Sequence, residues 1–311
     1  MNTDIQRIRT AIITSPLIGS MVRWGWRQYI TAIATNAPND CAEIPKVAGA
    51  GRCVLDSDGP YQIMHNGVKV KLGSYYGDLN TALIEKLQGH HEPQEEKVFY
   101  RVLKELPKTA VMVEAGSYWG YYSLWFKKER PSGSVFLIEP LEDHLEIGKT
   151  NFRMNNMNGE FLKAYVGATS ERAHNVKMEG RILEGVERVS IDDFMDRYGL
   201  SHVDLLHADV QGAERDLLIG AESSLSGGRI SYMFISTHGS KVHDECRELL
   251  TKHRFQIIAS HTRAESFTTD GLIVAKNEKI EGVTAITISK KHSTLLNDIW
   301  LVAHQVLSGP S

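Results

Sequence analysis

The sequence predicts an α/β fold built on a doubly wound, mostly parallel sheet. From residue 110 onward, short apolar segments alternate with helix-length amphipathic segments, which is the pattern of a parallel sheet covered by helices on both faces. The last two apolar segments, 255–259 and 271–275, are joined by a stretch without a helix-length apolar pattern. We therefore expect these two strands to pair as an antiparallel hairpin at the edge of the sheet.

The positions of the individual helices and strands are predicted from Pro and Gly residues and from the periodicity of apolar residues. Residues 36–60 are dense in Pro and Gly, which favours an irregular connector. Residues 61–72 form two segments of alternating apolar and polar residues on either side of Asn66-Gly67, which predicts a β-hairpin. Residues 93–106 begin with Pro and two Glu, which is typical of the first turn of a helix. Strands are predicted at 110–115, 135–139, 161–166, 203–209, 231–237, 255–259 and 271–275. Helices are predicted to begin near Trp119 and near Gly212 and to span 141–155 and 241–253.

Composition bounds the class of protein. The chain has 311 residues, 42% of them hydrophobic, and a net charge of −3, which excludes disordered and collagen-like chains. Without a basic excess, a general nucleic-acid-binding role is not expected. The three cysteines are odd in number and form no CxxC, which argues against a zinc ribbon or a disulfide framework and favours a reduced, cytoplasmic setting.

Both ends of the chain carry amphipathic patterns. We predict helices over 16–34 and 294–307 that dock onto the main domain or form a homodimer. No apolar run reaches the roughly 18 residues of a membrane span, so no membrane-spanning segment is expected. The predicted division is a helical extension and connector at 1–60, a catalytic domain at 61–277 and a C-terminal extension at 278–311.

The first strand-to-helix turn points to a cofactor. Its glycines, Gly116 and Gly120, are spaced G-x-x-x-G, with Tyr118 where dinucleotide-binding proteins have the middle glycine. Glu114 ends the first strand and can take an ammonium group, while Glu139 ends the second and can accept both ribose hydroxyls. An amino-acid end and a ribose end without a phosphate cradle describe S-adenosylmethionine.

The chain also resembles the FkbM-type S-adenosylmethionine-dependent methyltransferases over roughly residues 88–277. The resemblance implies a Rossmann-like, seven-stranded class I methyltransferase fold and, most often in that family, O-methylation of a sugar or natural-product hydroxyl. Gln211 stands where many members carry Glu. The motifs that carry the resemblance are His91-Glu-Pro-Gln-Glu-Glu, Val113-Glu-Ala-Gly-Ser-Tyr-Trp-Gly-Tyr-Tyr-Ser, Ile138-Glu-Pro, Ala208-Asp-Val-Gln-Gly-Ala-Glu, Ser236-Thr-His-Gly and Asp270-Gly-Leu-Ile-Val.

These observations give a set of candidate site residues. Asp209 ends the fourth strand and His238 follows the fifth, so both should face the ligand crevice. We expect His238 to be the base and Asp209 to orient it or the acceptor, with no metal at the site; a divalent ion shared by Asp209 and His238 is the alternative. The expected cofactor-binding residues are Glu114, Gly116, Ser117, Tyr118, Trp119, Gly120, Glu139, Pro140, Val166 and Gly167.

Some alternatives stay open at this point. A peptide side-chain amide is a second possible acceptor, and a non-catalytic nucleotide-binding partner protein is a third hypothesis. His207 lies within the fourth strand, where a satisfied core histidine is expected. His90, His91 and Glu92 precede a helix, either as a lid over the cofactor or as a polar loop.

Overall fold

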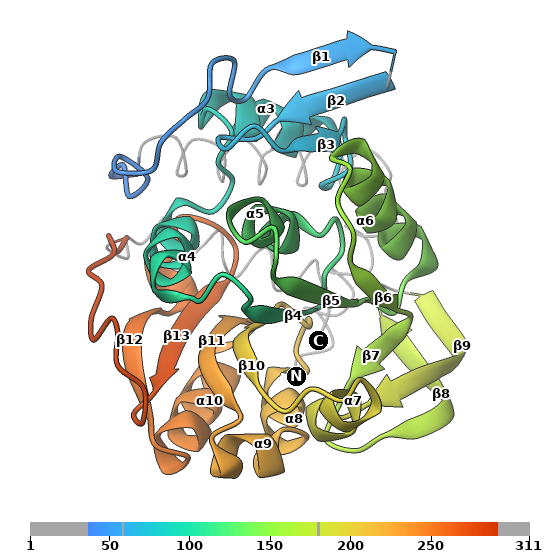
Figure 1. Cartoon of the computed structure of the whole chain (residues 1–311), viewed down its shortest axis with the longest axis vertical. Coiled ribbons are helices and arrows are strands. Elements are labelled where there is room, and N and C mark those ends of the chain that lie inside the picture. The colour runs from blue at the N-terminus through green and yellow to red at the C-terminus, as the bar shows by residue number, and fades with distance from the viewer. Residues whose placement is uncertain (1–36, 58, 179–180, 292–311) are drawn as a thin grey trace, which may run out of the picture.

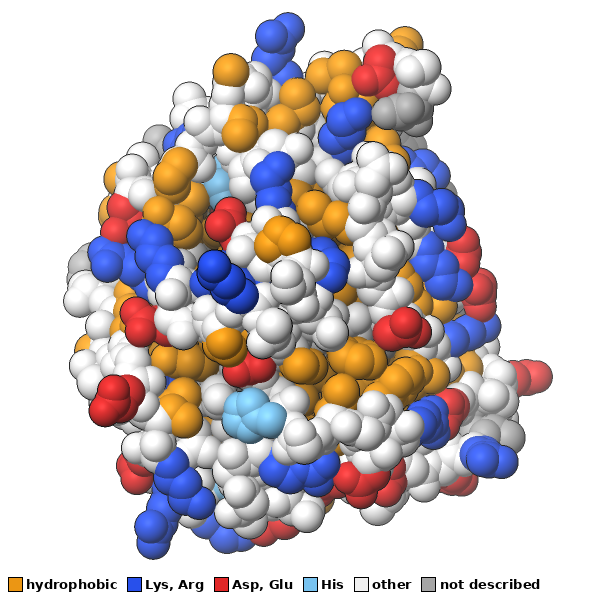
Figure 2. All heavy atoms as spheres, in the orientation of Figure 1, with side chains coloured by type: hydrophobic (Ala, Val, Ile, Leu, Met, Phe, Trp, Pro, Cys, Tyr) orange, Lys and Arg blue, Asp and Glu red, His pale blue; other side chains and the backbone are white. Residues whose placement is uncertain are grey.

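The computed structural model describes residues 37–57, 59–178 and 181–291. A central sheet lies between two groups of helices (Figure 1). One small three-stranded sheet lies beyond the helices of one face, and another lies beside one edge of the central sheet. Figure 2 shows Lys and Arg side chains interspersed with Asp and Glu over one face of the molecule, and hydrophobic side chains gathered across its middle.

The central sheet has seven strands and the predicted doubly wound topology. Pairing is parallel from β11 through to β6, whereas β13 is antiparallel to both β11 and β12. The predicted antiparallel hairpin is confirmed, and β13 is inserted between β12 and the parallel strands. The order across the sheet is β12 (Phe255–His261), β13 (Gly271–Asn277), β11 (Ile230–Thr237), β10 (Val203–Ala208), β4 (Val111–Ala115), β5 (Ser134–Ile138) and β6 (Glu160–Leu162).

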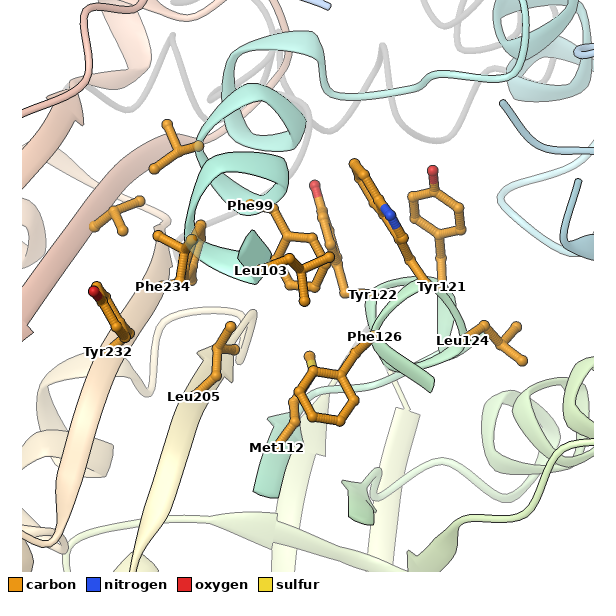
Figure 3. Close-up of a cluster of buried hydrophobic side chains, with 14 of the residues drawn as sticks. Phe99, Leu103, Met112, Tyr121, Tyr122, Leu124, Phe126, Leu205, Tyr232 and Phe234 are labelled. Atoms are coloured by element: carbon orange, nitrogen blue, oxygen red, sulfur yellow. The ribbon is translucent and has the colours of Figure 1, made fainter. Parts of the chain in front are cut away.

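Successive side chains along the strands point to opposite faces of the sheet, which gives one hydrophobic core for each helical layer. Met112, Leu205 and Phe234 pack on the side of α4 and α5, while the residue after Met112, Val113, packs on the opposite side. In Figure 3, Phe99 and Leu103 of α4 meet Tyr122 of α5 above the sheet. The first layer holds α4 (Pro93–Glu105), α5 (Tyr121–Glu129) and α6 (Glu142–Met154), and the second holds α7 (Ile191–Arg197), α8 (Glu214–Ile219), α9 (Glu222–Gly227) and α10 (Ser240–Lys252).

The N-terminal part of the described chain differs from the prediction. The expected hairpin is present, but the region expected to be an irregular connector contains a strand that pairs with it. The additional strand has little sequence signal because its Leu55 is 80% exposed; main-chain pairing rather than burial defines it. The small sheet comprises β1 (Cys53–Asp56), β2 (Gly59–Ile63) and β3 (Lys69–Lys71), and is followed by the unpredicted helix α3 (Asp78–Lys86).

The predicted third strand at 161–166 is in fact two strands. Its first half is β6, and its second half, β7 (Ala164–Val166), leaves the central sheet and pairs in parallel with β9 (Arg181–Val189). β9 also pairs with β8 (Glu171–Met178) in an antiparallel hairpin that the sequence did not predict. A short 3₁₀ helix, Arg263–Glu265, joins β12 to β13.

The predicted terminal helices at 16–34 and 294–307 lie outside the described residues. The division into 1–60, 61–277 and 278–311 therefore stays a prediction. Among the helices that the structure describes, none combines the length and the apolar character needed to cross a membrane.

Candidate active site

A cavity opens at the carboxyl ends of β4, β5 and β10, where ligands bind in open α/β sheets. Most of the expected site residues lie together on its wall. They are Glu114, Gly116, Ser117, Tyr118, Trp119, Glu139, Pro140, Val166 and Asp209.

The turn between β4 and α5 needs glycine for packing. A Cβ on Gly116 would lie 1.8 Å from the carbonyl oxygen of Asp209, and its φ of +73° also favours glycine. The turn's amides are already used: Gly116 and Ser117 donate to the carbonyl oxygen of Ile138, and Tyr118 donates to Glu139 Oε2. The turn therefore offers no amide cradle of the kind that binds pyrophosphate.

Two glycines expected at the cofactor have packing roles instead. Gly120, with φ +70°, caps α5, and a Cβ there would lie 3.1 Å from Leu137 and 3.3 Å from Phe152. A Cβ on Gly167 would lie 2.7 Å from the Arg188 side chain. Neither glycine is part of the cavity wall described above, because both stand where elements pack closely.

Glu139 is a buried carboxylate fixed by main-chain amides. Its Oε2 accepts from Tyr118 N at 3.0 Å and its Oε1 from Leu141 N at 2.9 Å. Each carboxylate oxygen has a further lone pair for a hydroxyl donor. At the other end of the glycine turn, Glu114 Oε2 accepts from Ser123 N at 3.0 Å, and burial raises the pKa of Glu114.

An aromatic wall, partly supplied by a loop before α3, borders the cavity. Tyr75 stacks on Trp119 with ring centroids 4.5 Å apart, and Tyr118 stacks on His144 at 3.9 Å. The Tyr76 amide donates to the Tyr118 hydroxyl at 3.2 Å. The sequence analysis did not identify this loop as part of the site, although two adjacent tyrosines between Gly73 and Gly77 were a usable signal.

Asp209 and His238 meet within a cluster of carboxylates. His238 Nε2 lies 3.3 Å from Asp209 Oδ1 and 3.5 Å from Asp270 Oδ1. His238 Nδ1 lies 2.5 Å from Glu214 Oε1. Asp209 lines the cavity, and His238 stands behind it with a side chain only 10% exposed.

These surroundings set the charges of the two residues. Burial lowers the pKa of His238, but the nearby Asp270, Glu214 and Asp209 outweigh burial and raise it to about 10. Burial raises the pKa of Asp209 to about 7; His238 opposes that rise and Asp270 adds to it. A histidine with this pKa is protonated at neutral pH and has no free lone pair, so the arrangement favours Asp209 rather than His238 as the base.

His207 is buried and paired, as expected of a core histidine, and it also lies on the cavity wall. Its side chain lines the cavity, and its Nε2 lies 2.7 Å from Glu95 Oε1 of α4. Its Nδ1 has no hydrogen-bond partner among the described residues. Ser236 Oγ donates to the other Glu95 oxygen at 3.4 Å, so Glu95 joins β10 to β11.

The His90-His91-Glu92 segment is neither a lid nor an exposed loop. Both histidines are buried, and His91 packs edge-on against Trp119 with ring centroids 5.1 Å apart. Glu92 Oε2 lies 3.1 Å from His91 Nε2 and accepts from the Tyr122 hydroxyl at 3.0 Å. His91 and Glu92 form a fixed part of the cavity wall.

A comparison with protein-family models identifies the part of the chain that carries these site residues. Residues 111–257 match the family model described as the methyltransferase FkbM domain. Residues 111–257 are an FkbM methyltransferase domain. The domain spans β4 to the start of β12 and so contains the glycine turn, Glu139, Asp209 and His238. The chain is an S-adenosylmethionine-dependent methyltransferase, and the non-catalytic hypothesis is no longer retained.

Solved structures of low identity are similar to part of the chain. TrmK of M. capricolum, solved with S-adenosylhomocysteine, is 13% identical with a TM-score of 0.40, covering 58% of this chain and 68% of that one. A precorrin-6y C5,15-methyltransferase from Geobacter metallireducens is 15% identical with a TM-score of 0.39, covering 58% and 88%. No curated protein matches the chain. Likenesses this distant say nothing about the acceptor.

Proposed function

We propose that the FkbM domain transfers the methyl group of S-adenosylmethionine to a hydroxyl of a sugar or natural product. The observation that carries this proposal is Asp209, a carboxylate on the cavity wall whose pKa is raised to about 7. A hydroxyl must lose its proton as it attacks, and a base titrating near neutral pH suits that task.

The cavity's donor and acceptor set suits this cofactor. Glu139 would accept the ribose hydroxyls and Glu114 would face the ammonium group, both from the cavity wall. Tyr118 and His144 would border the nucleoside end. When bound, S-adenosylmethionine supplies an electrophilic methyl group on its sulfonium. The used amides of the glycine turn argue against a pyrophosphate-containing cofactor.

The remaining steps belong to the protein's own residues. The Asp209 carboxylate would accept the proton of the acceptor hydroxyl as its oxygen bonds to the methyl carbon, the carbon–sulfur bond breaks and S-adenosylhomocysteine is left. His238 stays protonated beside Asp209 and Asp270 and keeps the Asp209 pKa from rising further. Trp119 and Tyr75 stack on each other in the cavity wall, and their apolar rings would limit the access of water to the reacting atoms. The Asp209 proton then returns to solvent.

The acceptor end of the cavity favours a polyhydroxylated ligand. Glu92 and Asp209 offer carboxylate oxygens that hydroxyl groups donate to, and Tyr122 offers an aromatic surface. A peptide side-chain amide would need the same base but presents a much poorer nucleophile. We therefore place the hydroxyl acceptor first.

The test is methyl transfer from radiolabelled S-adenosylmethionine to two acceptor panels, one of sugars and glycosylated natural products and one of Asn- and Gln-containing peptides. The expected result is label in an ether-linked methyl group that survives base treatment. Label found only on peptide nitrogen would overturn the hydroxyl proposal and favour the amide alternative.

A further inference from the structure

A second cluster of reactive side chains lies outside the residues that line the cofactor cavity. It joins Cys41, His65 of the turn between β2 and β3, His90 and Glu96 of the first turn of α4. All four are buried, with exposures of 2%, 1%, 1% and 0%. Because three distant segments converge here, a local sequence pattern could not have revealed the cluster.

The ligating atoms are close enough for one ion. Cys41, His90 and Glu96 each present a potential ligand atom, and these atoms all lie within 4.8 Å of one another. His90 Nδ1 faces Glu96 Oε2, and His65 Nδ1 lies 3.9 Å from the same oxygen. The two imidazole rings are stacked, with centroids 4.4 Å apart and planes 16° from parallel.

A second observation points to a ligand. His90 Nε2 is buried and has no hydrogen-bond partner within the described ranges, although buried polar atoms are nearly always paired. Glu96 Oε1 is occupied, because it accepts from the His91 amide at 2.8 Å and lies 2.8 Å from His91 Nδ1. Oε2 is thus the Glu96 oxygen that faces the cluster. The Cys41 thiol donates to the Pro93 carbonyl oxygen at 3.5 Å, and loss of the thiol proton would free the sulfur for a metal.

We propose that this cluster binds one divalent transition-metal ion, with zinc the best match to its ligands. Cys41 Sγ, a ring nitrogen of His90 and Glu96 Oε2 supply sulfur, nitrogen and oxygen, three ligand types that zinc accepts, and solvent would take the fourth position. On binding, the metal–sulfur bond forms, and the thiol proton leaves to solvent. None of the three ligands lines the cofactor cavity, so the role is structural.

The site would fix one wall of the active site. His91 follows His90 directly and contacts Glu96, and both His91 and Glu92 line the cofactor cavity. A metal at His90 and Glu96 would therefore hold these two cavity residues in place and tie the 37–52 segment to α4. This inference does not depend on the identity of the methyl acceptor.

The test uses the purified full chain and measures bound metal by mass spectrometry, together with the spectrum of the cobalt-substituted protein. Cys246 is the matched control, since it is also free and fully buried but lies in α10. The wild type and Cys246→Ser are expected to hold about one equivalent of zinc and to show thiolate-to-cobalt charge-transfer absorption. Cys41→Ser should lose that absorption, and Glu96→Gln should bind at least tenfold more weakly.

Two results would overturn the proposal. One is a wild-type protein that contains no metal and, when titrated with cobalt, develops no thiolate band. The other is a folded Cys41→Ser variant that keeps the metal and the spectrum of the wild type. If Cys41→Ser fails to fold, the cobalt titration of the wild type and of Cys246→Ser still decides the matter.

Discussion

Asp209 and His238 are neighbours with opposite charge preferences. Asp209 faces the cavity and is held near its titration point, while His238 is enclosed by carboxylates that keep it protonated. In the proposed mechanism the pair is a base and the cation that tunes it.

Replacing the base should remove turnover without removing the cofactor. Asp209→Asn keeps the shape of the side chain but cannot take the hydroxyl proton, so we expect kcat to fall about 10²–10⁴-fold. Calorimetry should give an S-adenosylmethionine affinity close to that of the wild type. A variant with normal kcat would remove Asp209 from the chemistry.

The pH profile separates the base from its tuning residue. Because Asp209 must be ionised and its pKa is about 7, kcat/KM should rise as pH increases through about 7 and then level off. His238→Gln removes a positive charge and should move the midpoint to higher pH, whereas Asp270→Asn removes a negative charge and should move it to lower pH. Shifts in the same direction, or no shift, would contradict this pairing.

Residues at strand ends were the part of the site that the sequence could predict. Asp209 and Glu139 were identifiable because the carboxyl ends of parallel strands meet at one edge. The contact between His207 and Glu95 spans 112 residues, and neither residue carries a local signal of it. The charge of His238 was equally hidden, since it depends on Asp270 and Glu214 from other elements.

At the scale of elements, the turn between β4 and α5 is the most constrained feature. Gly116→Ala would place a Cβ 1.8 Å from the Asp209 carbonyl oxygen, so it should destabilise the fold by several kcal/mol and displace Asp209. Gly199→Ala is the matched control, with φ +62° and nothing within 4 Å of the added Cβ; positive φ alone costs about 1–3 kcal/mol. Urea unfolding should show the larger loss for Gly116→Ala, and equal losses would refute the close approach.

Elements with a buried face were predictable, and those without one were not. The strands of the central sheet carry long apolar runs, and α4 has both a proline start and a buried stripe. In contrast, β1 and β9 expose large apolar side chains, Leu55 at 80% and Ile182 at 71%. Their strands arise from main-chain pairing with a neighbour, which leaves little periodicity in the sequence.

At the scale of the whole molecule, the segment before the FkbM domain shares its core. Cys41 and Ile44 pack in the same hydrophobic cluster as Phe99 and Trp125. The Ser289 amide donates to Asp40 Oδ2 at 3.1 Å, which joins the two ends of the described chain. The described core thus extends beyond residues 61–277 at both ends, and truncation within 37–60 would disturb it.

Removing residues 1–34 keeps every residue of the described core in the chain. We expect the truncated protein to fold but to lose acceptor affinity or its oligomeric state, because the amphipathic pattern over 16–34 needs an apolar surface to cover. Light scattering and methyl-transfer kinetics measure the two effects. Unchanged mass and unchanged activity would show that the segment is dispensable.

The central claim is that the cavity binds S-adenosylmethionine through Glu139, and isothermal titration calorimetry tests it without a known acceptor. Glu139→Ala should weaken binding by about 2 kcal/mol, or about 30-fold, the scale of a hydrogen bond to a charged group. Glu142→Ala, which removes a 56%-exposed carboxylate from α6, is the control and should bind like the wild type. NAD should not bind to either variant or to the wild type. Equal affinity of the wild type and a folded Glu139→Ala variant for S-adenosylmethionine would contradict the account.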